Sequence, residues 1–274
     1  MKGPFYYLVV NFALHFLIVF GCFAPILNPG SGIMWDKSGS ILINIVLMVM
    51  SWYCFYKTWK TPPGYVDNSH PHIATWRQRY EDTLEKYAEA MDKKSMDALP
   101  QLCHTCHVAR PYRSKHCKVS RKCVMLFDHY CPFVDNTIGL WNYKYFYWFL
   151  VTTSLGLLTF LFTFFSYVRR YHTEYGVWPW LTLMVGIELL ICLFPVGGLA
   201  AYHTQLTMAN LTTNEHINLR KYKYMFDQHK KYRNPWFKGY MGNFMDRMQP
   251  SHACYMISQE HQPLQSQTSG EENV

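Results

Sequence analysis

Four apolar blocks dominate this 274-residue chain, and each is close to the length of a bilayer-spanning helix. The hydrocarbon core of a membrane takes about 20 consecutive, mostly apolar residues in a helix. The blocks are Phe5–Leu27, Ser40–Tyr56, Phe146–Val168 and Val177–Ala201. Buried helices of a large soluble core are the alternative, but the chain has no set of amphipathic helices to surround them. The sequence therefore predicts an all-α polytopic membrane protein with four transmembrane helices.

The distribution of lysine and arginine predicts how these spans are oriented. Of the 26 basic residues, fourteen lie between Lys57 and Lys144, eight follow Ala201, and Lys2 precedes the first block. Cytosolic loops carry the excess of positive charge, so we expect both termini and the central segment to face the cytosol. The net charge of +8 then indicates attraction to an anionic leaflet or to phosphates. No motif indicates binding to nucleic acid.

The predicted spans and the polar segments between them divide the chain into five expected regions. Apolar residues recur at steps of three and four from Ile73 to Met91, which predicts an amphipathic helix. The last residues, from Gln259 onward, have the composition of a disordered tail. The expected regions are 1–60 with the first two spans, 61–102 with the cytosolic amphipathic helix and linker, 103–145 with a small Cys-rich domain of short β-hairpins, 146–201 with the last two spans, and 202–274 with the cytosolic C-terminal region.

Five of the nine cysteines lie between residues 103 and 131. In a reducing cytosol, clustered cysteines indicate metal binding or catalysis rather than disulfides. A CxxC pair followed by a His and a Cys at hairpin distance predicts a closed Cys3His tetrahedron around one structural zinc, with no position left for water or substrate. His104 and His107 are alternative ligands that we expect to be exposed. The four predicted ligands are Cys103, Cys106, His116 and Cys123.

Cys131 is left over from this ligand set and has neighbours suited to activating a thiol. Side chains alternate along an extended segment, so we expect His129 and Cys131 to point to one side. Asp128 is placed to hold the second nitrogen of the His129 ring. A thiol, an imidazole and a carboxylate in this order can form an activated nucleophile. On spacing alone, a fifth metal ligand or a structural cysteine explains Cys131 equally well.

The order of motifs resembles that of the Asp-His-His-Cys (DHHC) family of protein S-acyltransferases. Two further matches lie in the C-terminal region, and the resemblance runs from Phe5 to about Met248. It is strongest to the branch that carries ankyrin repeats, although this chain has no repeats. The matching elements are the CxxC pair, Arg110-Pro111, Ser114-x-His116-Cys117, Cys123, Asp128-His129-Tyr130-Cys131-Pro132, Gly139, Asn142-Tyr143-x-x-Phe146, Thr212-Thr213-Asn214-Glu215, and Asn234-Pro235-Trp236 to Asn243.

The resemblance implies a palmitoyltransferase. Cys131 would take a fatty acyl group from acyl-CoA as a thioester and pass it to a cysteine of a membrane-associated protein. His129 would be the general base and Asp128 would orient it. Arg110 and Arg113 are candidates to bind the CoA phosphates, because arginine binds phosphate bidentately, although a solvated basic face is the alternative. The family also implies a Golgi or endoplasmic reticulum membrane.

Three further residues carry a family interpretation beside a simpler one. Gly156 could leave room at the far end of an acyl pocket, or it could let two helices pack closely. Thr212 and Glu215 have the spacing of a helix capping box. The resemblance adds a contact between Thr213 and Asp128.

The chain departs from the family at a second zinc site. In this chain the Asp-His-His-Cys signature of the family is Asp-His-Tyr-Cys, with a tyrosine in place of the second histidine. Two more of the ligand positions hold serine or threonine. We therefore predict that the second zinc is absent. A catalytically weak membrane adaptor that binds client proteins is the alternative function, and a small transporter is suggested only by Glu188 within the fourth block. The positions that correspond to the second zinc site are Cys117, Ser120, Tyr130 and Thr137.

Overall fold

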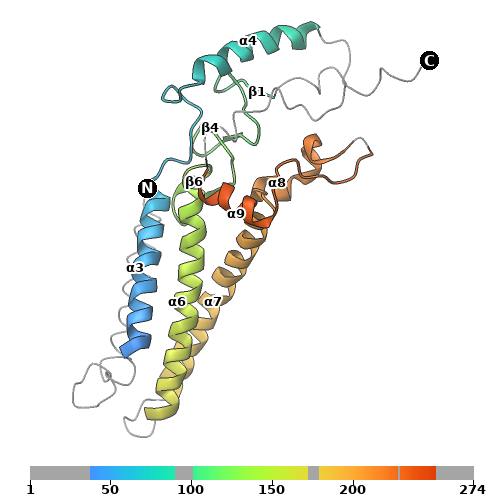
Figure 1. Ribbon diagram of the computed structural model, residues 1–274. Coiled ribbons are helices and arrows are strands. Elements are labelled where there is room, and N and C mark those ends of the chain that lie inside the picture. The colour runs from blue at the N-terminus through green and yellow to red at the C-terminus, as the bar shows by residue number, and fades with distance from the viewer. Residues whose placement is uncertain (1–37, 90–100, 172–178, 228, 251–274) are drawn as a thin grey trace. The chain divides into compact units, whose positions relative to one another are not determined.

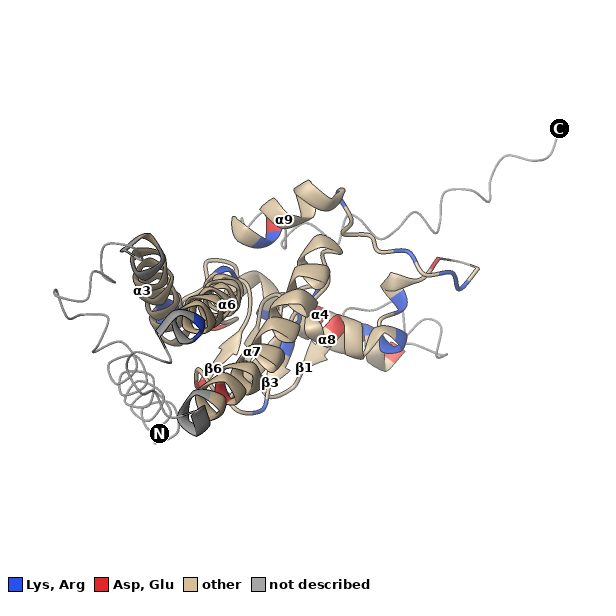
Figure 2. Cartoon of the chain, turned by 90° about the horizontal axis from the view of Figure 1, so that it is seen from below, with Lys and Arg blue, Asp and Glu red and all other residues tan. Residues whose placement is uncertain are grey.

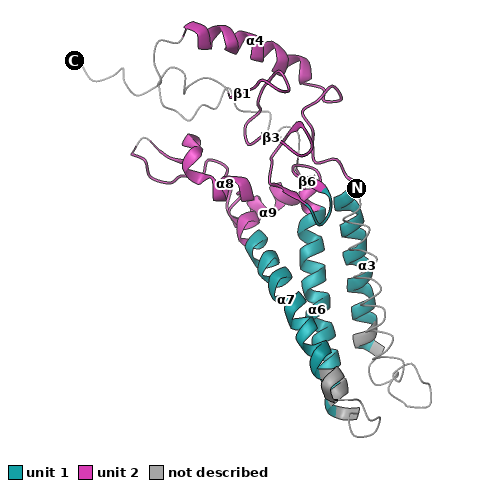
Figure 3. Cartoon of the chain, turned by 180° about the vertical axis from the view of Figure 1, so that it is seen from behind, with its two compact units in different colours: residues 1–60, 132–135, 145–204 teal, residues 61–131, 136–144, 205–274 magenta. Residues whose placement is uncertain are grey.

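The computed structural model describes residues 38–89, 101–171, 179–227 and 229–250 (Figure 1). The chain divides into two compact units, coloured separately in Figure 3. Unit 1 comprises residues 1–60, 132–135 and 145–204, and unit 2 comprises residues 61–131, 136–144 and 205–274. The first predicted span, Phe5–Leu27, lies outside the described residues.

The described part of unit 1 consists mainly of three long helices, α3 (Ser38–Lys60), α6 (Tyr143–Tyr171) and α7 (Pro179–Met208). Two segments, Tyr143–Ser166 and Leu183–Met208, are long and apolar enough to cross a membrane. Their 24 and 26 residues extend for roughly 36 and 39 Å at the rise of an α-helix. They overlap the third and fourth predicted spans, Phe146–Val168 and Val177–Ala201. The second predicted span is a helix, α3, of 23 residues.

Helices α3 and α6 approach each other closely within unit 1. The hydroxyl groups of Ser51 and Thr153 lie 2.6 Å apart and share a hydrogen bond. A Cβ atom added to Gly156 would lie 3.7 Å from Cβ of Leu47, which is ordinary van der Waals contact. Small residues let helices in a membrane pack at this separation. The structure therefore favours the helix-packing interpretation of Gly156.

The surfaces of these helices expose large apolar side chains. Phe162, Ile191 and Phe194 are 67%, 65% and 78% exposed. In Figure 2, α3 and α6 are seen nearly end-on, and most of the ribbon of α3, α6 and α7 is tan, the colour of uncharged residues. Glu188 is the only charged residue in α7. Exposed apolar surface of this extent is unusual in a soluble protein and fits contact with lipid.

The Cys-rich part of unit 2 is built from three antiparallel hairpins, as predicted. Strands of two or three residues are too short to bury a core of their own, so they depend on what packs around them. The strand pairs are β1 (Leu102–Cys103) with β2 (Val108–Ala109), β3 (Lys115–Cys117) with β4 (Lys122–Val124), and β5 (His129–Cys131) with β6 (Asn136–Ile138).

The predicted amphipathic helix is α4 (Ile73–Glu89), and it contributes Trp76 to the apolar core of the Cys-rich domain. Trp76 and Tyr80 on its inner face are 5% and 7% exposed. The last predicted helical residue, Met91, lies outside the described residues. Trp76 belongs to one buried cluster with two predicted zinc ligands, so α4 and the ligand set stabilise each other. The cluster consists of Val66, Trp76, Cys103, Val108, Cys123, Met125, Leu126 and Leu140.

The C-terminal region folds onto the last turn of α7 within unit 2. The side chain of Asn243 in α9 (Tyr240–Met248) donates to the carbonyl of Met208 at 2.6 Å. Asn234 donates in the same way to the carbonyl of Ala209. These bonds satisfy carbonyl groups that a helix end leaves without intrahelical partners. The other short helices of the region are α8 (Thr213–Ile217), η2 (Leu219–Lys221) and η3 (Lys223–Met225).

Candidate active site and metal centre

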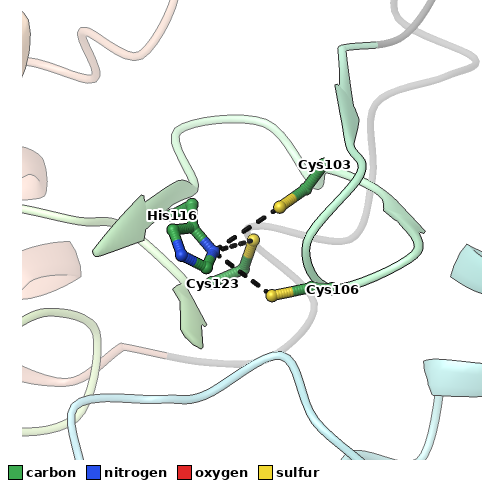
Figure 4. A group of neighbouring side chains, drawn as sticks. All are labelled: Cys103, Cys106, His116 and Cys123. Atoms are coloured by element: carbon green, nitrogen blue, oxygen red, sulfur yellow. Dashed lines mark hydrogen bonds between the residues drawn. The ribbon is translucent and has the colours of Figure 1, made fainter. Parts of the chain in front are cut away.

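The four predicted zinc ligands come together in the structure (Figure 4). Their ligand atoms all lie within 4.8 Å of one another. Nδ1 of His116 is 3.5 Å from Sγ of Cys103, 3.3 Å from Sγ of Cys106 and 3.9 Å from Sγ of Cys123. The hairpins explain this convergence, because His116 and Cys123 face each other across β3 and β4.

These distances fit a tetrahedral zinc ion. Zinc bonds of about 2.3 Å to sulfur and 2.0–2.1 Å to nitrogen place tetrahedral sulfur and nitrogen ligands roughly 3.5 Å apart. The three N···S separations, from 3.3 to 3.9 Å, lie around that value. Three thiolates and one imidazole are also the donor set of structural zinc sites. The group can therefore hold one metal ion with all four positions filled.

The alternative ligands His104 and His107 contact α4 and are not part of this group. Nδ1 of His104 lies 2.9 Å from the hydroxyl of Tyr80, and the His107 ring stacks on the Tyr80 ring at 5.7 Å. Both histidines are exposed, as predicted. These two histidines attach the turn around Cys103 and Cys106 to α4, and they are not metal ligands.

The residues at the second family zinc position do not fit a metal ion. Cys117 is buried, and its Sγ lies 3.3 Å from Oγ1 of Thr137. Tyr130 pairs with Thr137 across β5 and β6 and packs against the buried cluster that contains Cys117. One thiol among hydroxyl groups lacks the Cys, His and carboxylate donors that zinc sites use. A sulfur–hydroxyl contact and apolar packing occupy this position instead.

The candidate nucleophile lies on strand β5, which spans His129 to Cys131. His129 and Cys131 lie two positions apart on this strand, and their side chains share a hydrogen bond. Nδ1 of His129 lies 2.8 Å from Oδ2 of Asp128. Burial opposes protonation of His129, but its hydrogen bonds to Asp128 and Cys131 outweigh burial and raise its pKa to about 9. An imidazolium beside Cys131 favours the thiolate form of the thiol.

Asp128 is held from the C-terminal region as well as by His129. The backbone amide of Thr213 donates to Oδ1 of Asp128 at 3.1 Å, so the contact that the resemblance implied is present and is made by the main chain. The capping box is also confirmed, with Thr212 and Glu215 each bonding the other's backbone amide. This box places the first amide groups of α8 at the carboxylate.

Sequence reasoning missed Arg247, which approaches Asp128 from α9. Its Nη2 lies 3.2 Å from Oδ1 of Asp128, and both side chains are fully buried. The two residues are 119 positions apart. The motif from Asn234 to Asn243 indicates that the C-terminal region matters for the site, but no sequence pattern identifies Arg247.

The structure does not support the assignment of Arg113 to CoA phosphates. Its guanidinium is buried and donates to both carboxylate oxygens of Glu215 at 2.7 Å. A guanidinium that is buried in an ion pair cannot also bind a phosphate in solvent. Arg110 is half-buried and donates to Gln101 at the surface, so it keeps that candidate role.

Comparisons with known proteins find similarity to palmitoyltransferases and protein S-acyltransferases. Residues 97–220 match the family model described as DHHC palmitoyltransferase. Palmitoyltransferase ZDHHC17 of Mus musculus is 29% identical over 77% of this chain and 34% of its own length. Probable protein S-acyltransferase 5 of Arabidopsis thaliana is 34% identical over 53% of this chain and 30% of its own length. Palmitoyltransferase ZDHHC9 of Bos taurus is 42% identical over 42% of this chain and 33% of its own length.

The chain spans about a third of the length of these relatives. The matched segment contains the Cys3His group and the strand with Asp128, His129 and Cys131. Over residues 97–220 the chain is therefore similar to the DHHC palmitoyltransferases.

Proposed function

We propose that this protein is a protein S-acyltransferase that moves a long fatty acyl group, such as palmitoyl, from acyl-CoA to cysteines of membrane-associated proteins. The observation that carries the proposal is the chain of side chains from Asp128 through His129 to Cys131, with 2.8 Å between the carboxylate and the imidazole. This arrangement activates a thiol for attack on a carbonyl carbon.

The first step forms an acyl-enzyme. In the resting ion pair His129 already holds the proton of Cys131, and the Sγ thiolate attacks the thioester carbonyl carbon of acyl-CoA. A new carbon–sulfur bond forms to Cys131, and the bond to the CoA sulfur breaks. The imidazolium of His129 returns the proton to the leaving CoA thiolate. Asp128 keeps Nδ1 of His129 protonated, so that Nε2 faces the thiol.

The second step transfers the acyl group to a client protein. His129 is neutral again and accepts the proton of the client cysteine. The client thiolate attacks the acyl carbon on Cys131, a thioester forms on the client, and the protonated thiol of Cys131 is regenerated. In the acyl-enzyme, Cys131 no longer raises the pKa of His129, which favours the neutral imidazole that this step needs.

The Cys3His group would hold one zinc ion through Cys103, Cys106, His116 and Cys123. Zinc supplies folding energy at such a closed site and takes no part in the transfer. The hairpin that carries His116 and Cys123 is followed directly by the strand with the nucleophile. An ion held by these residues would therefore order the segment that leads into the active site.

We also propose the membrane arrangement of the chain. The two described spans fit a topology of four transmembrane helices, with both termini and the Cys-rich domain in the cytosol. The acyl chain would lie among the spans within the bilayer. Arg110 would bind phosphates of CoA at the cytosolic surface. The five sequence regions then serve as spans, linker, catalytic domain, spans and C-terminal region of a Golgi or endoplasmic reticulum protein.

Acyl loading tests the function directly. Purified wild type and the variant Cys131→Ser are incubated in detergent with labelled palmitoyl-CoA, and hydroxylamine is then used to release thioester-bound label. We expect hydroxylamine-sensitive label on the wild type and none on Cys131→Ser. If folded, zinc-loaded wild type takes no label but still binds client proteins, the chain is an adaptor and the enzyme proposal is wrong.

A further inference from the structure

Arg247 occupies an unusual environment in α9. Its guanidinium is fully buried, and the ring of Tyr143 lies 3.6 Å beneath it. Its Nη2 lies 3.2 Å from Oδ1 of Asp128, and all three residues belong to unit 2. Arginine stays charged in proteins, so a cation is present at this buried position. Burying a guanidinium costs free energy unless a specific partner compensates, and Asp128 is its charged partner here.

The carboxylate of Asp128 is held on both oxygens. Oδ2 accepts from Nδ1 of His129, while Oδ1 accepts from the amide of Thr213 and from Arg247. Burial favours the protonated form of a carboxylate, and nearby positive charges oppose it. A positive charge at 3.2 Å favours the ionised form, which accepts a hydrogen bond from His129 and does not compete with it as a donor.

We propose that Arg247 is a positioning residue of the acyl-transfer site, acting through Asp128 on His129 and Cys131, an inference that rests on the proposed acyltransferase function. Arg247 keeps Asp128 ionised and fixes the direction of its carboxylate. Asp128 in turn fixes the His129 ring with Nε2 toward Cys131. The site thus has a fourth member, which comes from the C-terminal region.

The competing explanation is that Arg247 only holds α9 in place. That task already has other contacts, because Asn243 bonds the carbonyl of Met208 and the amide of Lys238. A purely structural Arg247 would affect the amount of folded protein and its thermal stability. It would leave the chemistry of Cys131 in the folded fraction unchanged.

The first test measures single-turnover acyl loading from palmitoyl-CoA for the wild type, Arg247→Met and Arg247→Lys. We expect Arg247→Met to load roughly 10- to 100-fold more slowly, since small misplacements of reacting groups have effects of this size. Arg247→Lys keeps the charge and should recover part of the rate. Arg233→Met, a change at an exposed arginine of the same region, should load like the wild type.

A double-mutant cycle with Asp128→Asn decides whether Arg247 acts through Asp128. The doubly substituted protein should load no more slowly than Asp128→Asn alone, because the interaction that Arg247 supplies is already lost. The inference is overturned if the double variant, with full zinc content and normal thermal stability, loses rate by the product of the two single losses.

The second test does not need acyl transfer. Alkylation of Cys131 by iodoacetamide, followed by mass spectrometry across pH, reports the thiolate directly. Without Arg247, Asp128 takes up a proton more readily, and the His129 imidazolium that favours the Cys131 thiolate then loses its carboxylate partner. The alkylation profile should therefore move to higher pH in Arg247→Met.

The two proposals fail in different ways. If the wild type takes up no acyl group, the proposed function is wrong, and the alkylation profile alone decides the role of Arg247. If the wild type loads but Arg247→Met loads and alkylates identically, the function stands and the inference about Arg247 is wrong.

Discussion

Arg113 and Glu215 lie 102 residues apart and form a buried bidentate ion pair. Nε and Nη2 of Arg113 each lie 2.7 Å from one oxygen of Glu215, and the two side chains are 1% and 2% exposed. Arg113 also donates to the side chain and the carbonyl of Asn210, and Glu215 accepts from the amide of Thr212. One buried polar network therefore joins the Cys-rich segment to the C-terminal region within unit 2.

We predict that Glu215→Gln destabilises unit 2 strongly. The change leaves the charge of Arg113 buried without its partner, which costs about 3–5 kcal/mol in comparable pairs. The thermal unfolding midpoint in detergent measures the effect. Lys122→Gln is the control, because it breaks an ion pair with Asp67 of similar length, 2.8 Å, at a largely exposed position. That control should cost about 0–1 kcal/mol. Equal midpoints for the two variants would contradict the prediction.

The local parts of this site could be predicted from sequence, and the long-range parts could not. The Cys3His ligands lie within 21 positions, and short hairpins bring such spacings together. Strand alternation likewise placed His129 and Cys131 on one face. The partners of Arg113 and Asp128 are about a hundred residues away, and no periodicity or spacing encodes those contacts. The error over Arg113 arose for this reason, since an arginine near a basic loop looks exposed until its partner is known.

Removing the metal should unfold the Cys-rich domain. Two ligands, Cys103 and Cys123, belong to the same buried cluster as Trp76 of α4, so their release exposes that core. We expect about one zinc per chain by elemental analysis, and chelation should abolish protection of β1 to β4 and α4 from hydrogen exchange. Cys123→Ser should lose the zinc. Cys117→Ser is the matched control, since Cys117 lies outside the ligand group, and loss of zinc from that variant would refute this ligand assignment.

Restoring metal-binding side chains where the family has its second zinc site should create a second metal site in this protein. Cys117 is already there, with Thr137 beside its sulfur and Tyr130 opposite Thr137 on the neighbouring strand. The triple substitution Ser120→Cys, Tyr130→His and Thr137→Cys supplies a zinc donor set. Elemental analysis should then give about two zinc ions per chain. A value that stays at one in folded protein would mean that the backbone at this position differs from a zinc site.

Gly139 should tolerate no side chain. A Cβ atom there would lie 2.6 Å from Cγ1 of Val124, 2.7 Å from the carbonyl oxygen of Pro63 and 2.9 Å from that of Met125. Two of these contacts are to backbone that cannot rotate away, so Gly139→Ala should cost several kcal/mol through overpacking, at the upper end of the usual range of about 1–3 kcal/mol. Thermal unfolding and zinc content measure the loss. Gly198→Ala in α7 is the control, because a Cβ atom there meets nothing within 4 Å.

The protonation of His129 predicts how stability changes with pH. Asp128 and Cys131 raise the pKa of His129 from 6.5 to about 9, in spite of its burial. A raised pKa means that the folded protein binds the proton more tightly than the unfolded chain does. The stabilisation is therefore complete below pH 6.5 and is lost as the pH rises to about 9, by at most about 3 kcal/mol.

His129→Gln should remove this dependence, since glutamine cannot take up the proton. Unfolding midpoints measured between pH 6 and 10 should fall with rising pH in the wild type and change less in the variant. His216→Gln, at an exposed histidine of α8, should keep the slope of the wild type. A wild-type midpoint that rises over this range would show that His129 is neutral in the folded protein, and the thiolate–imidazolium pair would then be absent from the resting site.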